Sequence, residues 1–170
     1  AEDSAQKLSL EALQKNMDTI NAVIERGAVF LAVCAGFQIL GNTFYADGKE
    51  HKGLGLLNVD SIPGDKRYVG DIKVKYLGMD LELTGFENHA GKTILGNGAQ
   101  PFSKVESGFG NGDGKFDGAM NGNIFGTYLH GPILARNPEF ADLLLNRAIG
   151  HKFTTFNDPV ADRKSTRLNS

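Results

Sequence analysis

Apolar residues recur every three or four positions along the first stretch of the chain and stop at Gly27. This spacing predicts one amphipathic helix over residues 5–26, with Gly27 as its C-terminal cap. The residues that carry the pattern are Leu8, Leu10, Leu13, Met17, Ile20, Val23 and Ile24. A similar pattern, opened by Pro138 and carrying Phe140, Leu143, Leu144, Leu145 and Ile149, predicts a last helix near the other end.

A uniformly apolar run, Ala28–Val33, follows the first helix and predicts a strand buried on both faces. Small residues then form a turn, and residues 37–40 have the pattern of a helix. Further short strands are predicted at residues 44–45, 55–59, 69–76, 81–84 and 123–128. Residues 96–122, with the pairs Asn97-Gly98, Asn111-Gly112 and Asp113-Gly114, indicate hairpin turns and surface loop.

The order helix, strand, turn and helix is typical of an α/β protein, and we expect a three-layer, mostly parallel sheet with flanking helices. Such a sheet normally contains several βα units before its functional turn, so N-terminal strands are expected to be missing from this chain. Residues 1–156 are predicted to form one domain. Residues 157–170 are polar and aperiodic, which indicates a disordered or artefactual tail.

Composition narrows the classes of partner. The chain has 170 residues, 41% of them hydrophobic, and 18 basic against 20 acidic side chains give a formal net charge of -2. This balance gives no electrostatic reason to expect nucleic acid or an anionic membrane as partner. No stretch approaches the roughly 20 apolar residues of a membrane-spanning helix, and the first residues do not resemble a signal peptide. These features predict a cytoplasmic protein without membrane insertion.

Cys34, the one cysteine, lies where the predicted strand turns into a helix. Such a turn exposes its side chain, and the free N–H groups at the start of the helix favour a thiolate. This arrangement is a cysteine form of the nucleophile elbow. The alternative from position alone is a buried structural cysteine, which packs as a small hydrophobic residue.

His130 is the best candidate among the four histidines for the general base that takes the thiol proton. It follows the predicted strand at residues 123–128, so it is expected at the same sheet edge as Cys34. His51 and His151 lie in polar surroundings and are expected at the surface. His89 lies in a glycine-bounded polar cluster that either lines the site or forms a turn. The scattered histidines and one cysteine do not have the spacing of a metal site.

Several motifs resemble a known family. The segment Ala32-Val33-Cys34-Ala35-Gly36-Phe37-Gln38-Ile39-Leu40-Gly41 resembles the nucleophile turn of class I glutamine amidotransferases. The segment Tyr128-Leu129-His130-Gly131 resembles the histidine motif of their CobB/CobQ-like branch. Within that branch, Gly85-Phe86-Glu87-Asn88-His89 and Gly126-Thr127-Tyr128-Leu129-His130-Gly131-Pro132, with Leu134-Ala135-Arg136-Asn137-Pro138, look most like the GatD family, the glutaminase subunits of lipid II isoglutaminyl synthase.

This resemblance implies hydrolysis of L-glutamine by a Cys34–His130 pair. The backbone N–H of Ala35 would donate to the oxyanion, and the second donor would come from a loop that this chain does not contain. Gln38 matches the position that contacts the substrate, and Arg67 resembles the arginine that holds its carboxylate through two parallel hydrogen bonds. Pro132 stands where many class I enzymes have a glutamate.

The third member of a triad therefore remains open. Glu87 could still orient a histidine, and Glu87 and His89 are possible site-lining residues. Nothing in this subunit is expected to hold a cofactor or metal.

The resemblance also implies a heterodimer with a MurT-like Mur ligase subunit. That partner would use ATP and Mg to activate the D-glutamate of the lipid II stem peptide, so lipid II would be reached through the partner during peptidoglycan biosynthesis, which maintains cell shape. Three alternatives remain open: an amidotransferase domain of cobyrinic or cobyric acid synthesis, an inactive amidotransferase-like binding module, and a hydrolase of another amide or ester.

Overall fold

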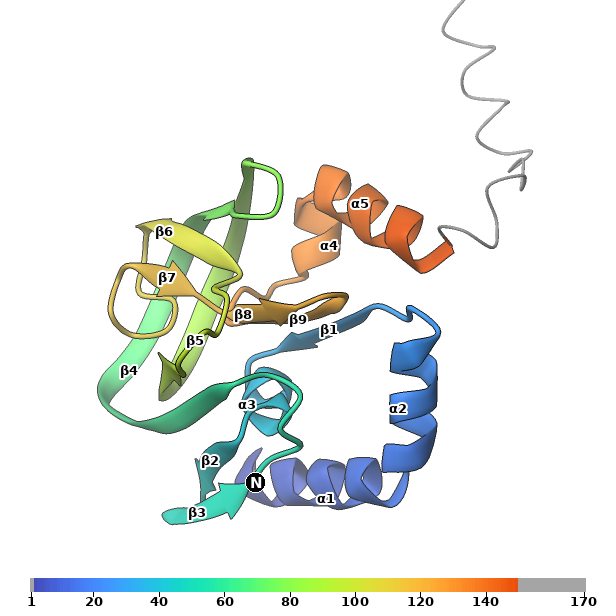
Figure 1. Ribbon diagram of the computed structural model, residues 1–170. Coiled ribbons are helices and arrows are strands. Elements are labelled where there is room, and N and C mark those ends of the chain that lie inside the picture. The colour runs from blue at the N-terminus through green and yellow to red at the C-terminus, as the bar shows by residue number, and fades with distance from the viewer. Residues whose placement is uncertain (1, 150–170) are drawn as a thin grey trace, which may run out of the picture.

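The computed structural model describes residues 2–149, with side chains described for residues 6–148. It contains two β-sheets with helices packed around them (Figure 1), which confirms the expected α/β class with flanking helices. The helices are α1 (Glu2–Lys15), α2 (Met17–Glu25), α3 (Ala35–Leu40), α4 (Ile133–Arg136) and α5 (Pro138–Ile149). None of these helices is long and apolar enough to span a membrane. The expected tail at residues 157–170 and His151 lie outside the described residues.

The smaller sheet has three strands in the order β1 (Phe30–Val33), β9 (Ile124–Thr127) and β8 (Ala119–Asn121). The larger sheet is ordered β3-β2-β4-β6-β7, and β5 pairs with β4. Its strands are β2 (Thr43–Ala46), β3 (Lys49–Lys52), β4 (Val59–Tyr76), β5 (Leu81–Leu95), β6 (Ser103–Ser107) and β7 (Phe116–Asp117).

The strand pairing differs from a mostly parallel sheet. Parallel pairing joins β1 to β9 and, through Thr43 and Asp60, β2 to β4, whereas the other pairs between named strands are antiparallel. The long β4–β5 hairpin accounts for most of the difference. The sequence pattern predicted only the ends of these strands, because glycines and polar residues interrupt the alternation between them.

One loop assignment and one strand assignment also need correction. Residues 96–122 contain β6, β7 and β8 as well as turns, although Gly98, Gly112 and Gly114 do adopt the positive φ values expected of the turns. Residues 55–59 are not a strand apart from Val59, where β4 begins. The amides of Leu56 and Leu57 instead donate to the carbonyl of Leu40, so this apolar run closes the end of α3.

The predicted first helix is two helices, which run in different directions (Figure 1). Asn16 lies at the break, and its side-chain Nδ2 donates to the carbonyl of Ala12 at 2.8 Å. A side chain that binds backbone carbonyls in this way competes with regular helical geometry. Gly27 caps α2 as expected: it has φ +85°, its amide donates to Ile24, and the amide of Ala28 donates to Val23.

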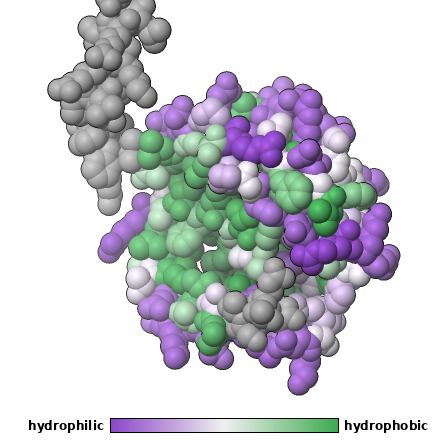
Figure 2. Space-filling view, turned by 180° about the vertical axis from the view of Figure 1, so that it is seen from behind, coloured by the Kyte–Doolittle hydropathy of each residue, from purple (hydrophilic) through white to green (hydrophobic). Residues whose placement is uncertain are grey.

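β1 is only partly buried, contrary to the expectation from its apolar sequence. It lies at an edge of the three-stranded sheet and lines an apolar cavity of about 320 Å³ between the first two helices and α3. The lining residues are Leu13, Ile20, Phe30, Leu31, Ala32, Val33, Gly36, Leu40, Leu54 and Leu56. Figure 2 shows apolar side chains around a hollow on this face of the molecule.

The main core lies between the β4–β6 part of the larger sheet, β9 and α5. Four aromatic rings meet there edge to face or tilted, from Tyr76, Phe102, Phe125 and Phe140, and all are at most 1% exposed. A second apolar cluster packs α3 against β9. These two clusters fix the turn between β1 and α3, where the candidate nucleophile lies.

Candidate active site

Cys34 occupies a strained turn between β1 and α3. Its backbone has φ 53° and ψ −113°, a conformation that L-residues rarely adopt and that is often found at functional sites. Parallel pairing of Val33 with Thr127 places the residues that follow them at one sheet edge. Consequently the amide of Cys34 donates to the carbonyl of Thr127 at 2.9 Å, and its Sγ lies 3.7 Å from the carbonyl oxygen of Tyr128.

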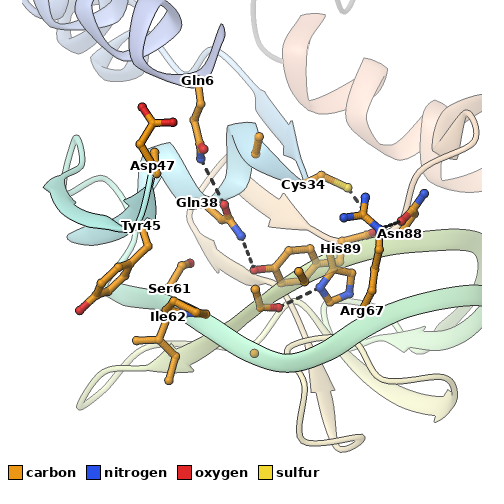
Figure 3. A pocket seen from close by; sticks show the side chains of 18 residues that line it. Gln6, Cys34, Gln38, Tyr45, Asp47, Ser61, Ile62, Arg67, Asn88 and His89 are labelled. Atoms are coloured by element: carbon orange, nitrogen blue, oxygen red, sulfur yellow. Dashed lines mark hydrogen bonds between the residues drawn. The ribbon is translucent and has the colours of Figure 1, made fainter. Parts of the chain in front are cut away.

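The side of this turn opens on a cavity of about 440 Å³ (Figure 3). Five of the residues selected from the sequence line it: Cys34, Ala35, Gln38, Arg67 and His89. The other lining residues come from α1, the β2–β3 hairpin, β4, β5 and the segment after β9. The cavity is large enough for a small amino acid, and its polar groups come from several segments that are distant in the sequence.

Gln38 lies at the centre of a chain of hydrogen bonds. Its Oε1 accepts from Nε2 of Gln6 at 3.1 Å, and its own Nε2 donates to the hydroxyl of Tyr128 at 3.1 Å. That hydroxyl lies 2.6 Å from Oγ1 of Thr93. Because each bond restricts the rotation of the Gln38 amide, this side chain is held in one orientation at the cavity wall (Figure 3).

Arg67 reaches the cavity from an irregular part of β4. The register of the β4–β5 pair shifts between Pro63 and Tyr68, and such bulges redirect side chains. The Nε of Arg67 donates to Oδ1 of Asn88 at 2.6 Å. This bond uses one edge of the guanidinium group, so its two terminal nitrogens remain the pair suited to a carboxylate.

His130 lies three residues after the end of β9, the strand that pairs with β1. Its backbone exchanges two hydrogen bonds of 2.9 Å with Phe86, and its ring packs edge to face on the Phe86 ring. It is partly buried, and the residues that line the cavity beside Cys34 include His89 but not His130. The role of His130 therefore stays a prediction.

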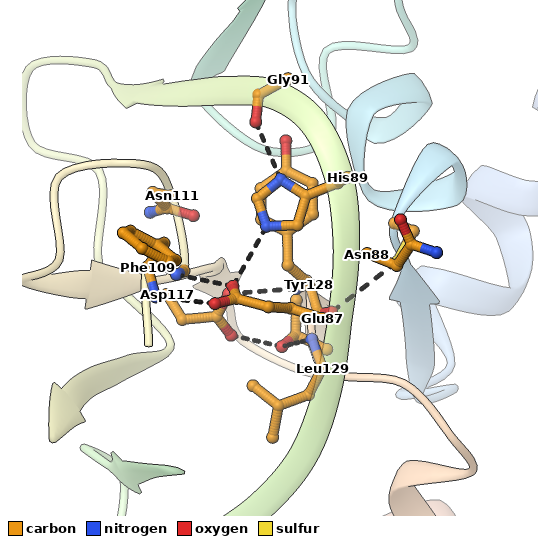
Figure 4. A network of polar contacts seen from close by, with 12 residues as sticks. Glu87, Asn88, His89, Gly91, Phe109, Asn111, Asp117, Tyr128 and Leu129 are labelled. Carbon is orange, nitrogen blue, oxygen red and sulfur yellow. Dashed lines mark hydrogen bonds and ion pairs between the residues drawn. The ribbon is translucent and has the colours of Figure 1, made fainter. Parts of the chain in front are cut away.

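Glu87 and His89 form a buried hydrogen-bonded pair beneath the cavity (Figure 4). Residues two apart on a strand face the same side, and this face of β5 points inward. His89 Nε2 lies 3.2 Å from Oε2 of Glu87, and its Nδ1 lies 2.9 Å from the carbonyl oxygen of Gly91. Since both neighbours are acceptors, the ring satisfies both bonds when each nitrogen carries a proton.

Glu87 is saturated by further donors. Its Oε1 accepts from the amide of Phe109 at 2.8 Å, and its Oε2 accepts from the amide of Gly110 at 2.9 Å. The carboxylate is 1% exposed, so these bonds replace the water that it would otherwise bind. The possible third member of a triad thus orients His89 rather than His130 in this structure.

Asp117 and Tyr128 complete the buried network, and the sequence analysis assigned no role to either. Asp117 accepts hydrogen bonds from the hydroxyl of Thr127 and, at 3.1 Å, from the amide of Tyr128. Burial raises the pKa of Asp117 from 3.8 to about 6, and it also raises the pKa of the Tyr128 hydroxyl. Tyr128 belongs to the histidine motif, so the motif could have signalled it; Asp117 lies in the glycine-rich stretch and has no such signal.

The strained cysteine turn and the polar cavity match a known class of domain. Residues 1–138 match the CobB/CobQ-like glutamine amidotransferase domain, and the chain belongs to this family. This match confirms the resemblance drawn from the cysteine and histidine motifs.

Among curated proteins, the chain is 36% identical over 155 residues to the GatD subunit of lipid II isoglutaminyl synthase (glutamine-hydrolyzing) from Streptococcus pneumoniae, covering 89% of this chain and 60% of that protein. The Staphylococcus aureus subunit of the same name is also 36% identical, with coverage of 96% and 67%.

A more distant relative is the cobyric acid synthase of Limosilactobacillus reuteri, which is 34% identical over 148 residues, covering 81% of this chain and 29% of that protein. The chain thus spans about two thirds of the length of the GatD relatives. A solved glutamine amidotransferase from Thermotoga maritima aligns with a TM-score of 0.49 and 17% identity, covering 95% of this chain and 66% of that one.

Proposed function

We propose that this chain is the glutamine-hydrolysing part of a GatD-like amidotransferase. The observation that carries the proposal is the position of Cys34: a strained strand-to-helix turn places its thiol on a polar cavity that also holds Gln38 and Arg67. An arginine with two terminal nitrogens suits the α-carboxylate of an amino acid, and a fixed amide suits its polar groups.

In this mechanism the sulfur of Cys34 attacks the side-chain carbonyl carbon of L-glutamine after His130 takes the thiol proton. A C–S bond forms, and the carbonyl electrons move to the oxygen, which accepts from the backbone N–H of Ala35. The tetrahedral intermediate collapses as the C–N bond breaks, and His130 returns the proton to the leaving nitrogen, so ammonia departs. Water then hydrolyses the thioester, which releases glutamate and restores the thiol.

The ammonia passes to a second subunit in the complete enzyme. We propose a cytoplasmic heterodimer with a MurT-like ligase, which uses ATP and Mg to amidate the D-glutamate of lipid II. Support comes from the two GatD relatives, of which this chain covers 60% and 67%, against 29% of the cobyric acid synthase. The latter share is smaller because that relative is a much longer chain.

The test is release of glutamate from L-glutamine by the protein, measured alone and with a Mur-ligase-like subunit. Cys34→Ala provides the blank, and we expect it and His130→Ala to abolish release while each variant keeps its circular dichroism spectrum. Turnover that persists in Cys34→Ala contradicts the nucleophile assignment. Hydrolysis of other amides or esters in preference to glutamine would instead support a different hydrolase.

A further inference from the structure

The proposed mechanism assigns no role to the buried Glu87–His89 pair. Both side chains are nearly inaccessible, at 1% and 6% exposure, yet His89 forms part of the cavity wall. Hydrogen bonds between buried polar groups are a poor source of stability, because they largely replace the bonds to water that the same groups lose on burial. Its position beneath the substrate cavity therefore calls for a functional explanation.

Tyr128 connects this pair to the substrate site. The imidazole of His89 lies flat against the Tyr128 ring, with centroids 3.8 Å apart and planes 12° apart (Figure 4). The ring of Phe37 contacts the same tyrosine ring edge to face, with ring centroids 5.3 Å apart. His89 and Phe37 therefore hold the ring on two sides, which restricts the position of its hydroxyl.

The hydroxyl of Tyr128 then determines where the Gln38 amide points. It accepts a hydrogen bond from Gln38 Nε2 and lies within bonding distance of Thr93 Oγ1, which in turn lies 3.1 Å from Ser61 Oγ. A hydroxyl oxygen can accept two hydrogen bonds, so either Tyr128 or Thr93 can donate in the bond between them. The backbone of the same tyrosine provides the carbonyl oxygen that faces Cys34 Sγ.

We propose that the hydrogen-bonded Glu87–His89 pair is a positioning unit for glutamine binding, which acts through Tyr128 on the orientation of the Gln38 amide. Glu87 fixes the imidazole, the imidazole fixes the tyrosine ring, and the tyrosine hydroxyl fixes the amide that contacts the substrate. This inference rests on the proposed function, since it concerns how the same cavity binds L-glutamine. Neither Glu87 nor His89 is required to touch the substrate.

The test uses 6-diazo-5-oxo-L-norleucine, a glutamine analogue with a diazoketone in place of the amide. The thiol of Cys34 displaces N2 from this probe and forms a thioether, with the thiol proton transferred to the probe carbon. Mass spectrometry of the labelled protein gives both the half-saturating probe concentration and the maximal labelling rate. Iodoacetamide, which carries no amino acid group, reports the reactivity of Cys34 without recognition.

We expect Glu87→Gln and His89→Gln to raise the half-saturating concentration by roughly 5- to 10-fold, the effect of one displaced hydrogen bond, with the maximal rate within about twofold of the original protein. Glu82→Gln is the matched control, because Glu82 lies on the same strand and its side chain is exposed and paired with Lys73. This control should label as the original protein does.

A double-mutant cycle separates positioning from a general structural effect. In a Gln38→Ala background, His89→Gln should cause no further rise in the half-saturating concentration, because the amide on which it acts is gone. An equal rise in both backgrounds overturns the inference, as does unchanged labelling of His89→Gln in the presence of Gln38. If the original protein reacts with iodoacetamide but never saturably with the diazoketone, the proposed function itself fails.

Discussion

Gly126 in β9 leaves the space that the ring of Phe37 occupies: a Cβ at residue 126 would lie 2.0 Å from Phe37 Cδ2. Phe37 is completely buried and also contacts Tyr128, so this approach holds α3 and the Cys34 turn against the sheet. The glycine is therefore required for the site as well as for packing.

Gly126→Ala should lower the free energy of unfolding by about 2 to 3 kcal/mol, because the added methyl forces a buried ring to move. Urea denaturation followed by circular dichroism measures this loss. Adding Phe37→Leu to Gly126→Ala should recover part of the lost free energy of unfolding, because the smaller leucine side chain leaves room for the added methyl. Gly36→Ala is the control: its Cβ would meet only Ala32 at 3.7 Å, so stability should stay the same or rise slightly.

Helices and strands were predictable from the sequence where the repeat of apolar residues along the chain was uninterrupted. The cap at Gly27, the turn at Cys34 and the last helix all follow local rules that operate within a few residues. The break at Asn16 was not predicted, because the apolar period continues across it and only the side chain of Asn16 interrupts the helix.

The candidate site was only partly predictable for a different reason. Cys34, Gln38 and His89 each lie in a recognisable local motif, and the structure brings all three to one cavity. The connection of His89 to Tyr128 depends on a cross-sheet contact between residues 39 positions apart, and no sequence period encodes such a contact. The burial of Asp117 likewise depends on strands in the glycine-rich segment, which the sequence pattern did not predict.

Two buried tyrosines should respond oppositely to the same substitution. The hydroxyl of Tyr76 is buried and, within the described part of the chain, has no hydrogen-bond partner, whereas that of Tyr128 has partners in Thr93 and Gln38. Tyr76→Phe should leave stability unchanged or raise it by up to about 1 kcal/mol, because an unsatisfied polar group is removed. Tyr128→Phe should lower it by about 1 to 2 kcal/mol.

Thermal unfolding of both variants in one buffer gives this comparison directly, and each serves as the control for the other. A loss of stability in Tyr76→Phe as large as that in Tyr128→Phe would mean that the Tyr76 hydroxyl has a bonding partner after all.

Asp117 should make stability depend on pH. Burial raises its pKa from 3.8 to about 6, so the folded protein keeps this proton to higher pH than the unfolded chain does. The stabilisation from the protonated carboxyl is therefore fully present below about pH 4 and is lost as the pH rises towards 6. The loss is on the order of 3 kcal/mol if the unfolded carboxyl has its ordinary pKa.

Asp117→Asn stays neutral and can keep both contacts, accepting from the Tyr128 amide and donating to Thr127. Its free energy of unfolding, compared with that of the original protein, should rise between pH 4 and pH 6 and stay constant above that range. Asp71→Asn, which alters an exposed carboxylate, is the control. A difference between Asp117→Asn and the original protein that does not change with pH would contradict the raised pKa.

A substitution at Gly91 should weaken substrate binding and leave stability almost unchanged. A Cβ at this position would lie 2.5 Å from Nε2 of Gln38, at the far end of a side chain, so the fold can accommodate the methyl by breaking the hydrogen bonds of that amide and moving it. Gly91→Ala should therefore unfold within about 1 kcal/mol of the original protein. The displaced amide can no longer donate to the Tyr128 hydroxyl, so the KM for L-glutamine should rise roughly 5- to 10-fold with little change in kcat.

Steady-state glutamate release measures the two constants, and Gly36→Ala again provides the stability comparison. Combining Gly91→Ala with Gln38→Ala should give the KM of Gln38→Ala alone, because the amide that the methyl displaces is then absent. If Gly91→Ala lowers kcat and leaves KM unchanged, the amide of Gln38 acts in the chemical step and not in binding, and its orientation by Tyr128 would belong to the transition state.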